Sequence, residues 1–148
     1  MDSQFQSDLL LAMAVGFGFM MIFRFWPRFQ AKLMGIPFIS ADEAKRRMDD
    51  DENVLVIDVR TADEFTGTLG HIEGALNLEA GNLHQKLLAL GDDLDPYKTN
   101  HIIVACRTQN RSPKAARLLF QSGFGNLAIL DGGMMGWGKA GYPVSTKG

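Results

Sequence analysis

The sequence predicts an α/β fold: a mainly parallel sheet with helices on both faces, preceded by one long apolar helix at the N-terminus. Three observations predict it. Strand-like runs alternate with helix-like stretches from residue 36 onward, as in βαβ units. The strand-like runs are short and apolar, which is typical of strands buried on both faces. Residues 9–23 contain no charged or polar side chain, which is typical of a membrane-spanning helix.

Length and composition favour one globular domain and exclude several classes of protein. The chain has 148 residues, about the size of one domain, and its 46% hydrophobic residues exclude a disordered or fibrous chain. Its net charge of −2 lacks the basic excess of a nucleic-acid-binding domain, so we expect no nucleic-acid partner. The single cysteine, Cys106, excludes an intramolecular disulfide and a multi-cysteine zinc site. The histidines lack ligand spacing, and we expect no metal and no cofactor.

The apolar run at residues 9–23 is extended by Phe25 and Trp26. A spanning helix needs roughly 20 apolar residues, so Arg24 must carry its charge to the membrane surface by snorkelling if the helix crosses. Pro27 is a position where such a helix bends or ends.

Three interpretations of this run compete. A cleaved signal peptide is disfavoured because the chain starts with the acidic MDSQFQSD and no A-x-A site follows. A buried or interfacial helix is a second possibility, although the run has no polar face for lying flat on a membrane. We favour a single transmembrane anchor. Because Arg24, Arg28 and Lys32 follow the run, the positive-inside rule places the rest of the chain in the cytoplasm, at a bacterial inner membrane.

Small residues within the run have the spacing that lets two membrane helices approach closely: Ala12 with Gly16, and Ala14 with Gly18. Alanine and glycine are common in membrane helices, so we expect at most a weak homo-oligomer through these pairs.

Secondary-structure signals follow one another along the rest of the chain. Ser40 and Glu43 form a capping box for a helix that reaches about Asp50, and Gly123 suits a helix C-terminus. Apolar runs predict four strands, at residues 54–57, 75–78, 101–105 and 127–130. Helical stretches lie around residues 62–66, 83–90, 113–121 and 134–139. The predicted organisation is a polar N-terminus at 1–8, an anchor at 9–26, a basic juxtamembrane linker at 27–38 and an α/β domain at 39–146.

The residues with the clearest chemistry follow the strand at 101–105. Cys106 comes directly after it, then the polar loop 107–111, then Ser112 as a natural N-cap and Pro113 as a natural first helical residue. The carboxyl edge of a parallel sheet is where α/β proteins bind their ligands. We therefore expect a ligand site at Cys106.

The surroundings of Cys106 favour a reactive thiolate. A short loop that enters a helix can direct several backbone N–H groups inward, and Arg107 and Arg111 add positive charge. The alternative is that Cys106 is a small buried apolar residue, which is common for a lone cysteine.

Taken with three further groups of motifs, this loop makes residues 39–143 resemble the rhodanese-like, or sulfurtransferase, domain. Each motif is weak alone, but their order and spacing together are specific. In chain order they are Asp58-Val-Arg60; then Glu64-Phe65 together with Gly70-His-Ile-Glu-Gly-Ala75 and Asn77; then the loop from Cys106 to Arg111; and last Leu130-Asp-Gly-Gly-Met-Met-Gly-Trp137.

The resemblance implies a five-stranded parallel sheet and a persulfide mechanism. The Cys106 thiolate would take the outer sulfur of a donor such as thiosulfate and pass it to cyanide or a thiol. The Arg111 side chain would lie at the rim and attract an anionic donor. Backbone N–H groups would hold the transferred sulfur, and they belong to Arg107, Thr108, Gln109, Asn110, Arg111 and Ser112.

Loop length and composition refine this expectation. The loop between Cys106 and Arg111 is one residue shorter than in the phosphatase and arsenate-reductase relatives of the fold. A shorter loop suits one sulfur atom better than a tetrahedral oxyanion, which favours sulfur transfer over phosphate hydrolysis. Gln109 stands where many loops of the family have glycine, and we expect Asn110 to adopt the left-handed conformation instead.

The remaining motif residues are expected to support the loop. Arg60 either contacts the donor or forms an ion pair with Asp58 or Glu64. His71 is expected to pack and hydrogen-bond rather than to act as a base. No Gly-Lys-Ser/Thr follows the later glycines, so a tight turn is expected there rather than a phosphate loop, at Gly132, Gly133 and Gly136.

A second hypothesis is a non-catalytic, membrane-tethered binding or sensor module, in which the loop binds a peptide or anion. Gln109 favours this hypothesis, whereas the intact Cys106 and Arg111 argue against it. With no second cysteine, the chain cannot resolve a persulfide as an intramolecular disulfide, so any resolving thiol must come from another molecule.

Overall fold

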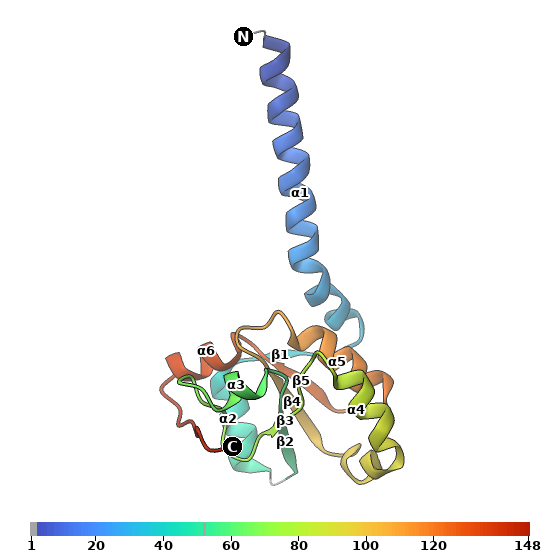
Figure 1. The fold of residues 1–148 in the computed structure, drawn as a ribbon, viewed down its shortest axis with the longest axis vertical. Coiled ribbons are helices and arrows are strands. Elements are labelled where there is room, and N and C mark those ends of the chain that lie inside the picture. Colours follow the sequence, from blue (N-terminus) through green and yellow to red (C-terminus); the bar gives the residue numbers. More distant parts are fainter. Residues whose placement is uncertain (1–2, 52) are drawn as a thin grey trace.

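A long N-terminal helix stands on a small α/β domain in the computed structural model, which describes residues 3–51 and 53–148 (Figure 1). The helix, α1, spans Ser3–Leu33, and the domain follows. The domain holds one sheet, and its helices pack against the two faces of that sheet.

The sheet has five parallel strands in the order β1-β5-β4-β2-β3. This confirms the expected sheet, and the four runs recognised in the sequence all form strands. The fifth, β1, has only two residues, and it pairs with β5 at the edge. The strand bounds are Phe38–Ile39 for β1, Val54–Asp58 for β2, Leu76–Asn77 for β3, His101–Ala105 for β4 and Leu127–Leu130 for β5.

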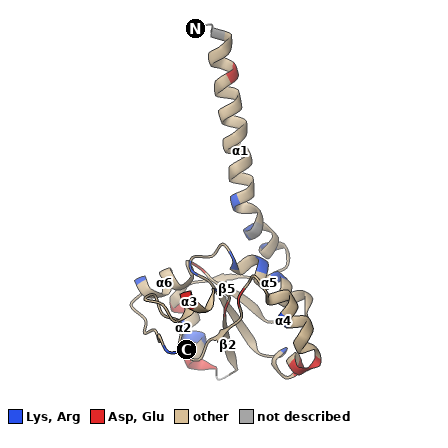
Figure 2. Ribbon diagram, in the orientation of Figure 1, with Lys and Arg blue, Asp and Glu red and all other residues tan. Residues whose placement is uncertain are grey.

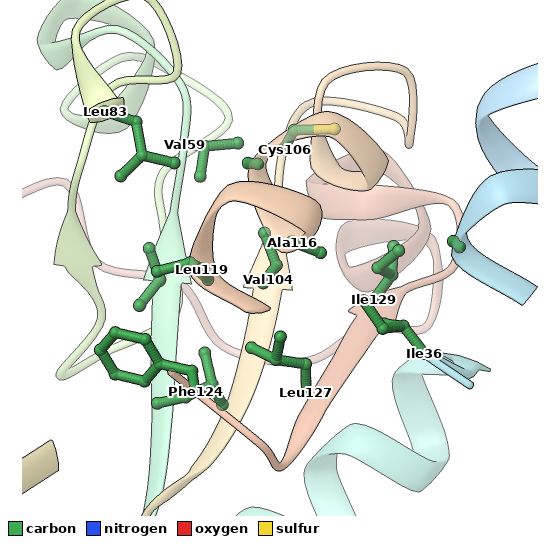
Figure 3. Packing of buried hydrophobic residues seen from close by; sticks show 14 of the residues in the cluster. Ile36, Val59, Leu83, Val104, Cys106, Ala116, Leu119, Phe124, Leu127 and Ile129 are labelled. Carbon is green, nitrogen blue, oxygen red and sulfur yellow. The ribbon is translucent and has the colours of Figure 1, made fainter. Parts of the chain in front are cut away.

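Helices cover both faces because successive residues of a buried strand point to opposite sides. In β4, Ile102 and Val104 face a cluster that includes α4, α5 and the end of α1 (Figure 3). Ile103 and Ala105 face the opposite cluster, which includes α2 and α6. The bounds are Ala41–Asp50 for α2, Ala62–Phe65 for α3, Leu83–Leu90 for α4, Ser112–Gln121 for α5 and Gly133–Lys139 for α6, with a 3₁₀ helix η1 at Gly91–Tyr97.

Helix ends follow local capping rules. The Ser40 side chain accepts a hydrogen bond from the Glu43 N–H, but the Glu43 carboxylate pairs with Arg46 and Arg47 instead of reaching back. The reciprocal capping box was expected there and is therefore only half formed. The left-handed Gly123, with φ of 96°, closes α5 as expected.

The segment Gln4–Trp26 of α1 is long and apolar enough to cross a membrane, and none of it is buried against the domain. This exposure argues against a buried core helix. Figure 2 shows basic residues toward the domain end of α1 and an acidic residue near its other end.

The last turns of α1 pack against the domain. The backbone of residues 27–33 is helical, and Ala31 is fully buried in the cluster beneath α5. Arg28 pairs with Asp131 at 3.0 Å, and Arg117 donates to the Gln30 side chain at 3.2 Å. The boundaries of the anchor, the linker and the domain remain predictions.

Candidate active site

Cys106 lies at the carboxyl edge of the sheet, directly after β4 and ahead of the loop that leads into α5. Figure 1 shows this loop on the side of the domain that faces α1. The Cys106 side chain is only 1% exposed and packs in the same cluster as Val59 and Val104. In Figure 3 its sulfur points away from Val59. A thiol with so little exposure is suited only to a small reactant.

The loop is held from behind by the first turn of α6. The Met134 N–H donates to the Cys106 carbonyl at 2.8 Å, and the Met135 N–H donates to the Arg107 carbonyl at 3.0 Å. The Gln109 side-chain oxygen accepts from the Gly132 N–H at 2.7 Å. The unusual Gln109 therefore ties the loop to α6, a role that spacing along the sequence does not reveal.

Gly133 allows this close approach. Its φ is +58°, and a Cβ at this position would lie 2.4 Å from the Cys106 carbonyl oxygen and 2.5 Å from that of Thr108. No side chain fits there without moving the loop. The expected tight turn is present, and Gly133 in this turn lies directly against the backbone of the loop.

Asn110 does not adopt the left-handed conformation expected of it. Among the described residues, only glycines have positive φ. Gly132 and Gly133, in the facing turn, supply the left-handed backbone at this site instead. The loop closes without a left-handed residue of its own.

Arg111 forms a bidentate ion pair with Glu64, with both N–O distances at 2.7 Å. Glu64 also accepts from the Thr61 N–H, completing a capping box at α3. The Arg111 hydrogen bonds hold the pKa of Glu64 at about 2, well below its usual range, and Glu64 in turn raises the pKa of Arg111. The positive charge expected at the rim is therefore largely compensated by Glu64.

Arg60 forms a buried ion pair with Asp58, and both side chains are 1% exposed. Its guanidinium donates to Asp58 and to the backbone carbonyls of Gly70 and Glu64. Of the two expected roles, the structure places Arg60 in the ion pair with Asp58. Its charge is thereby compensated inside the fold.

His71 and Asn77 hold the segments beside this pair. The His71 Nδ1 lies 2.8 Å from the Phe65 carbonyl, and its ring stacks on Phe65 at 3.5 Å between centroids. Asn77 donates to the carbonyls of Asp58 and Arg60, a contact that the sequence did not predict.

The remaining loop residues differ in exposure. Ser112 is fully buried and is the first residue of α5, whereas Arg111 occupies the N-cap, so the expected capping by Ser112 is not observed. Arg107 is exposed and Thr108 is half-buried. Within the ranges 3–51 and 53–148, no cluster of three or more metal-ligating side chains occurs.

Substitution of Glu64 by glutamine should destabilise the fold in a pH-dependent way. The depressed pKa of Glu64 stabilises the folded state above about pH 4.5, and this contribution is lost as the pH falls toward 2. We expect Glu64→Gln to lower the free energy of unfolding by about 1 kcal/mol at neutral pH. The difference from wild type should shrink below pH 4.5, as measured by urea unfolding at several pH values. The exposed Glu73→Gln is the matched control, and a difference that does not vary with pH would contradict the prediction.

Substitution of Gly133 by alanine should displace the loop. We expect a loss of about 1–3 kcal/mol in the free energy of unfolding, because a positive φ and a backbone clash both oppose the Cβ. Gly138→Ala in the same helix is the control, since its Cβ meets nothing within 4 Å. Equal effects of the two substitutions in thermal unfolding would show that the close approach at Gly133 is unimportant.

Comparison with known proteins gives a consistent result. The family model for the rhodanese-like domain matches residues 40–140. A sulfurtransferase from Allochromatium vinosum is 30% identical over 106 residues, which cover 72% of this chain and 92% of that protein. The thiosulfate sulfurtransferase GlpE of Actinobacillus succinogenes is 30% identical over 96 residues, covering 64% of this chain and 78% of that protein. The crystal structure of a rhodanese-related protein from Thermoplasma volcanium has a TM-score of 0.62 at 27% identity, covering 75% of this chain and 99% of that one. The chain belongs to the rhodanese-like domain family, whose relatives include sulfurtransferases.

Proposed function

We propose that the protein is a sulfurtransferase that moves a sulfane sulfur from a donor such as thiosulfate to cyanide or a thiol through a persulfide on Cys106. The observation that carries the proposal is the position of Cys106, directly after β4 and before a loop that leads into the N-terminus of α5. The names of the relatives support sulfur transfer, and thiosulfate appears in one of them.

The reaction needs no oxidant and no metal. The Cys106 thiolate attacks the outer sulfur of thiosulfate, the S–S bond of the donor breaks, and sulfite leaves with the bonding electron pair. The acceptor then attacks the outer sulfur of the Cys106 persulfide and regenerates the thiolate, with thiocyanate as the product when cyanide is the acceptor. This is a two-step covalent mechanism in which the leaving groups are stable anions.

The loop backbone suits the intermediate. Among the described residues, the N–H groups of Arg107, Thr108, Gln109 and Asn110 have no hydrogen-bond acceptor. Such groups, together with the start of α5, favour negative charge on sulfur. Arg111 contributes by holding the loop against α3 through Glu64.

A non-catalytic binding or sensor module is the second candidate. It is favoured by the burial of Cys106, whose side chain packs among apolar residues. The two candidates differ in one outcome: only a sulfurtransferase loads sulfur on Cys106.

Incubation with thiosulfate should add one sulfur atom, about 32 Da, to the intact chain by the covalent route. Intact mass spectrometry measures the adduct, and subsequent cyanide should remove it and release thiocyanate. Cys106→Ser should show neither adduct nor thiocyanate, whereas Ser122→Ala leaves both unchanged. Full activity of Cys106→Ser would exclude the mechanism, and no adduct on the wild-type chain from thiosulfate or a persulfide would favour the non-catalytic module.

We further propose that α1 is a single-pass anchor in the bacterial inner membrane, with the domain in the cytoplasm. The apolar segment Gln4–Trp26 and the basic residues that follow it support this placement. Gly16 and Gly18 have open space around them, which leaves room for a second helix in a weak homo-oligomer.

The full-length chain should stay in the membrane after high salt and alkaline carbonate, and protease should digest the domain only from the cytoplasmic side. These outcomes follow from a spanning helix with basic residues on its inner side. Extraction by carbonate would show a peripheral helix, and digestion from the outer side would show the opposite orientation. A mature chain that lacks α1 would instead identify a signal sequence.

A further inference from the structure

A cavity of about 350 Å³ separates α1 from the loop that carries Cys106. One wall comes from α1 and the other from the loop and the first turn of α5. Its lining residues are Phe23, Arg24, Arg28, Gln109, Asn110 and Pro113. Residues that are distant in the sequence, on the apolar helix and on the candidate active loop, therefore meet in one site.

The charge of this cavity comes from α1. Arg111 and Arg60 are held by Glu64 and Asp58, so their charges are already compensated. Among the described residues, Arg24 forms no ion pair. Arg28 pairs with Asp131, but both side chains are about half exposed, at 40% and 50%, and such surface pairs are weak. The guanidinium groups of Arg24 and Arg28 are thus available to an anion.

The loop wall of the cavity also carries two amide groups. The Gln109 oxygen accepts from the Gly132 N–H, which leaves the Gln109 NH₂ as a donor, and Asn110 carries a second amide. Guanidinium and amide donors together match the oxygen atoms of an oxyanion.

The position of α1 is fixed by its last turns. Ala31 is buried beneath α5, and Gln30 accepts from Arg117. These contacts fix α1 relative to the domain and keep its arginines beside the loop.

We propose that this cavity is the entrance for an anionic sulfur donor, and that Arg24 and Arg28 of the anchor helix recognise the oxygen atoms of that donor. The inference rests on the proposed function and names the recognition residues of the same site. It assigns to α1 a direct part in substrate binding, because Arg24 and Arg28 line this cavity, whereas the exposed Arg107 of the loop lines a different one.

Lipid headgroups present the same anionic oxygen chemistry as the donor, and the cavity borders the apolar segment. The experiment therefore uses the full-length chain first in an uncharged detergent and then in bilayers with anionic lipid. The donors are thiosulfate and an organic hydropersulfide that has no oxygen atoms, which transfers its outer sulfur to Cys106 and leaves as a thiol.

Arg24→Gln should raise the KM for thiosulfate about fivefold in the uncharged detergent, as expected for the loss of one partly exposed charge contact. Loading by the hydropersulfide should change much less, because it has no oxygen atoms for the guanidinium groups to bind. Lys32→Gln is the matched control, because it removes the same charge from the same helix without lining the cavity. Arg28→Gln should act in the same direction as Arg24→Gln.

An unchanged KM for thiosulfate in Arg24→Gln would overturn the inference, as would equal losses with both donors. A loss that occurs only in bilayers with anionic lipid would assign the arginines to lipid headgroups and would also overturn it. Binding of thiosulfate to Cys106→Ala, measured by calorimetry with and without Arg24→Gln, decides the inference even if no sulfur is transferred. Failure of the proposed function appears separately, as a wild-type chain that loads sulfur from neither donor.

Discussion

The contact between the loop after β4 and the first turn of α6 organises the whole carboxyl edge of the sheet. Two strands of a parallel sheet deliver these segments to the same edge. There, Met134 and Met135 donate to the loop carbonyls, and Gly133 leaves no space between the two backbones. The loop that follows Cys106 is therefore positioned mainly by backbone hydrogen bonds, with the Gln109 side chain as an additional link to the turn before α6.

The site contains two ion pairs, one in the protein interior and one near the surface. The Asp58–Arg60 pair is almost fully buried. Its hydrogen bonds connect the last residue of β2 to the turn at Gly70. A buried pair of this kind is costly to break, because a lone charge would remain in the interior. The Glu64–Arg111 pair joins α3 to the loop and is partly exposed. Both pairs therefore act mainly on architecture, and neither supplies a net positive charge to a ligand.

Much of the fold could be predicted from the sequence, because its signals are local. The runs at residues 54–57, 101–105 and 127–130 form strands since each is apolar and bounded by turn residues. The two residues of β1 are too few to show a period, and they join the sheet only through β5. The capping box at Thr61 and Glu64 carries the usual spacing and could have been recognised.

The site was less predictable, because partner choice depends on distances across the fold. Sequence spacing left Arg60 with Asp58 or Glu64 as partners, and only tertiary structure gives Glu64 to Arg111. The conformation of Asn110 and the partner of Gln109 also depend on tertiary structure and could not be predicted from sequence spacing. The left-handed backbone lies in the facing turn, and the Gln109 side chain bridges to that turn. The position of Cys106 and of the loop was predictable, since it depends only on where β4 ends and α5 begins.

The unbroken passage of α1 into the domain has a consequence for how the protein meets other molecules. A domain on a flexible linker sweeps a wide volume, and its effective concentration near a partner depends on linker length. Here the helix and Ala31 make the apolar segment and the domain one stiff rod with a globular end. If α1 spans a bilayer, its tilt sets the height and the facing direction of the loop above the lipid. The size and shape of a partner, as well as its chemistry, would then decide whether it reaches the loop.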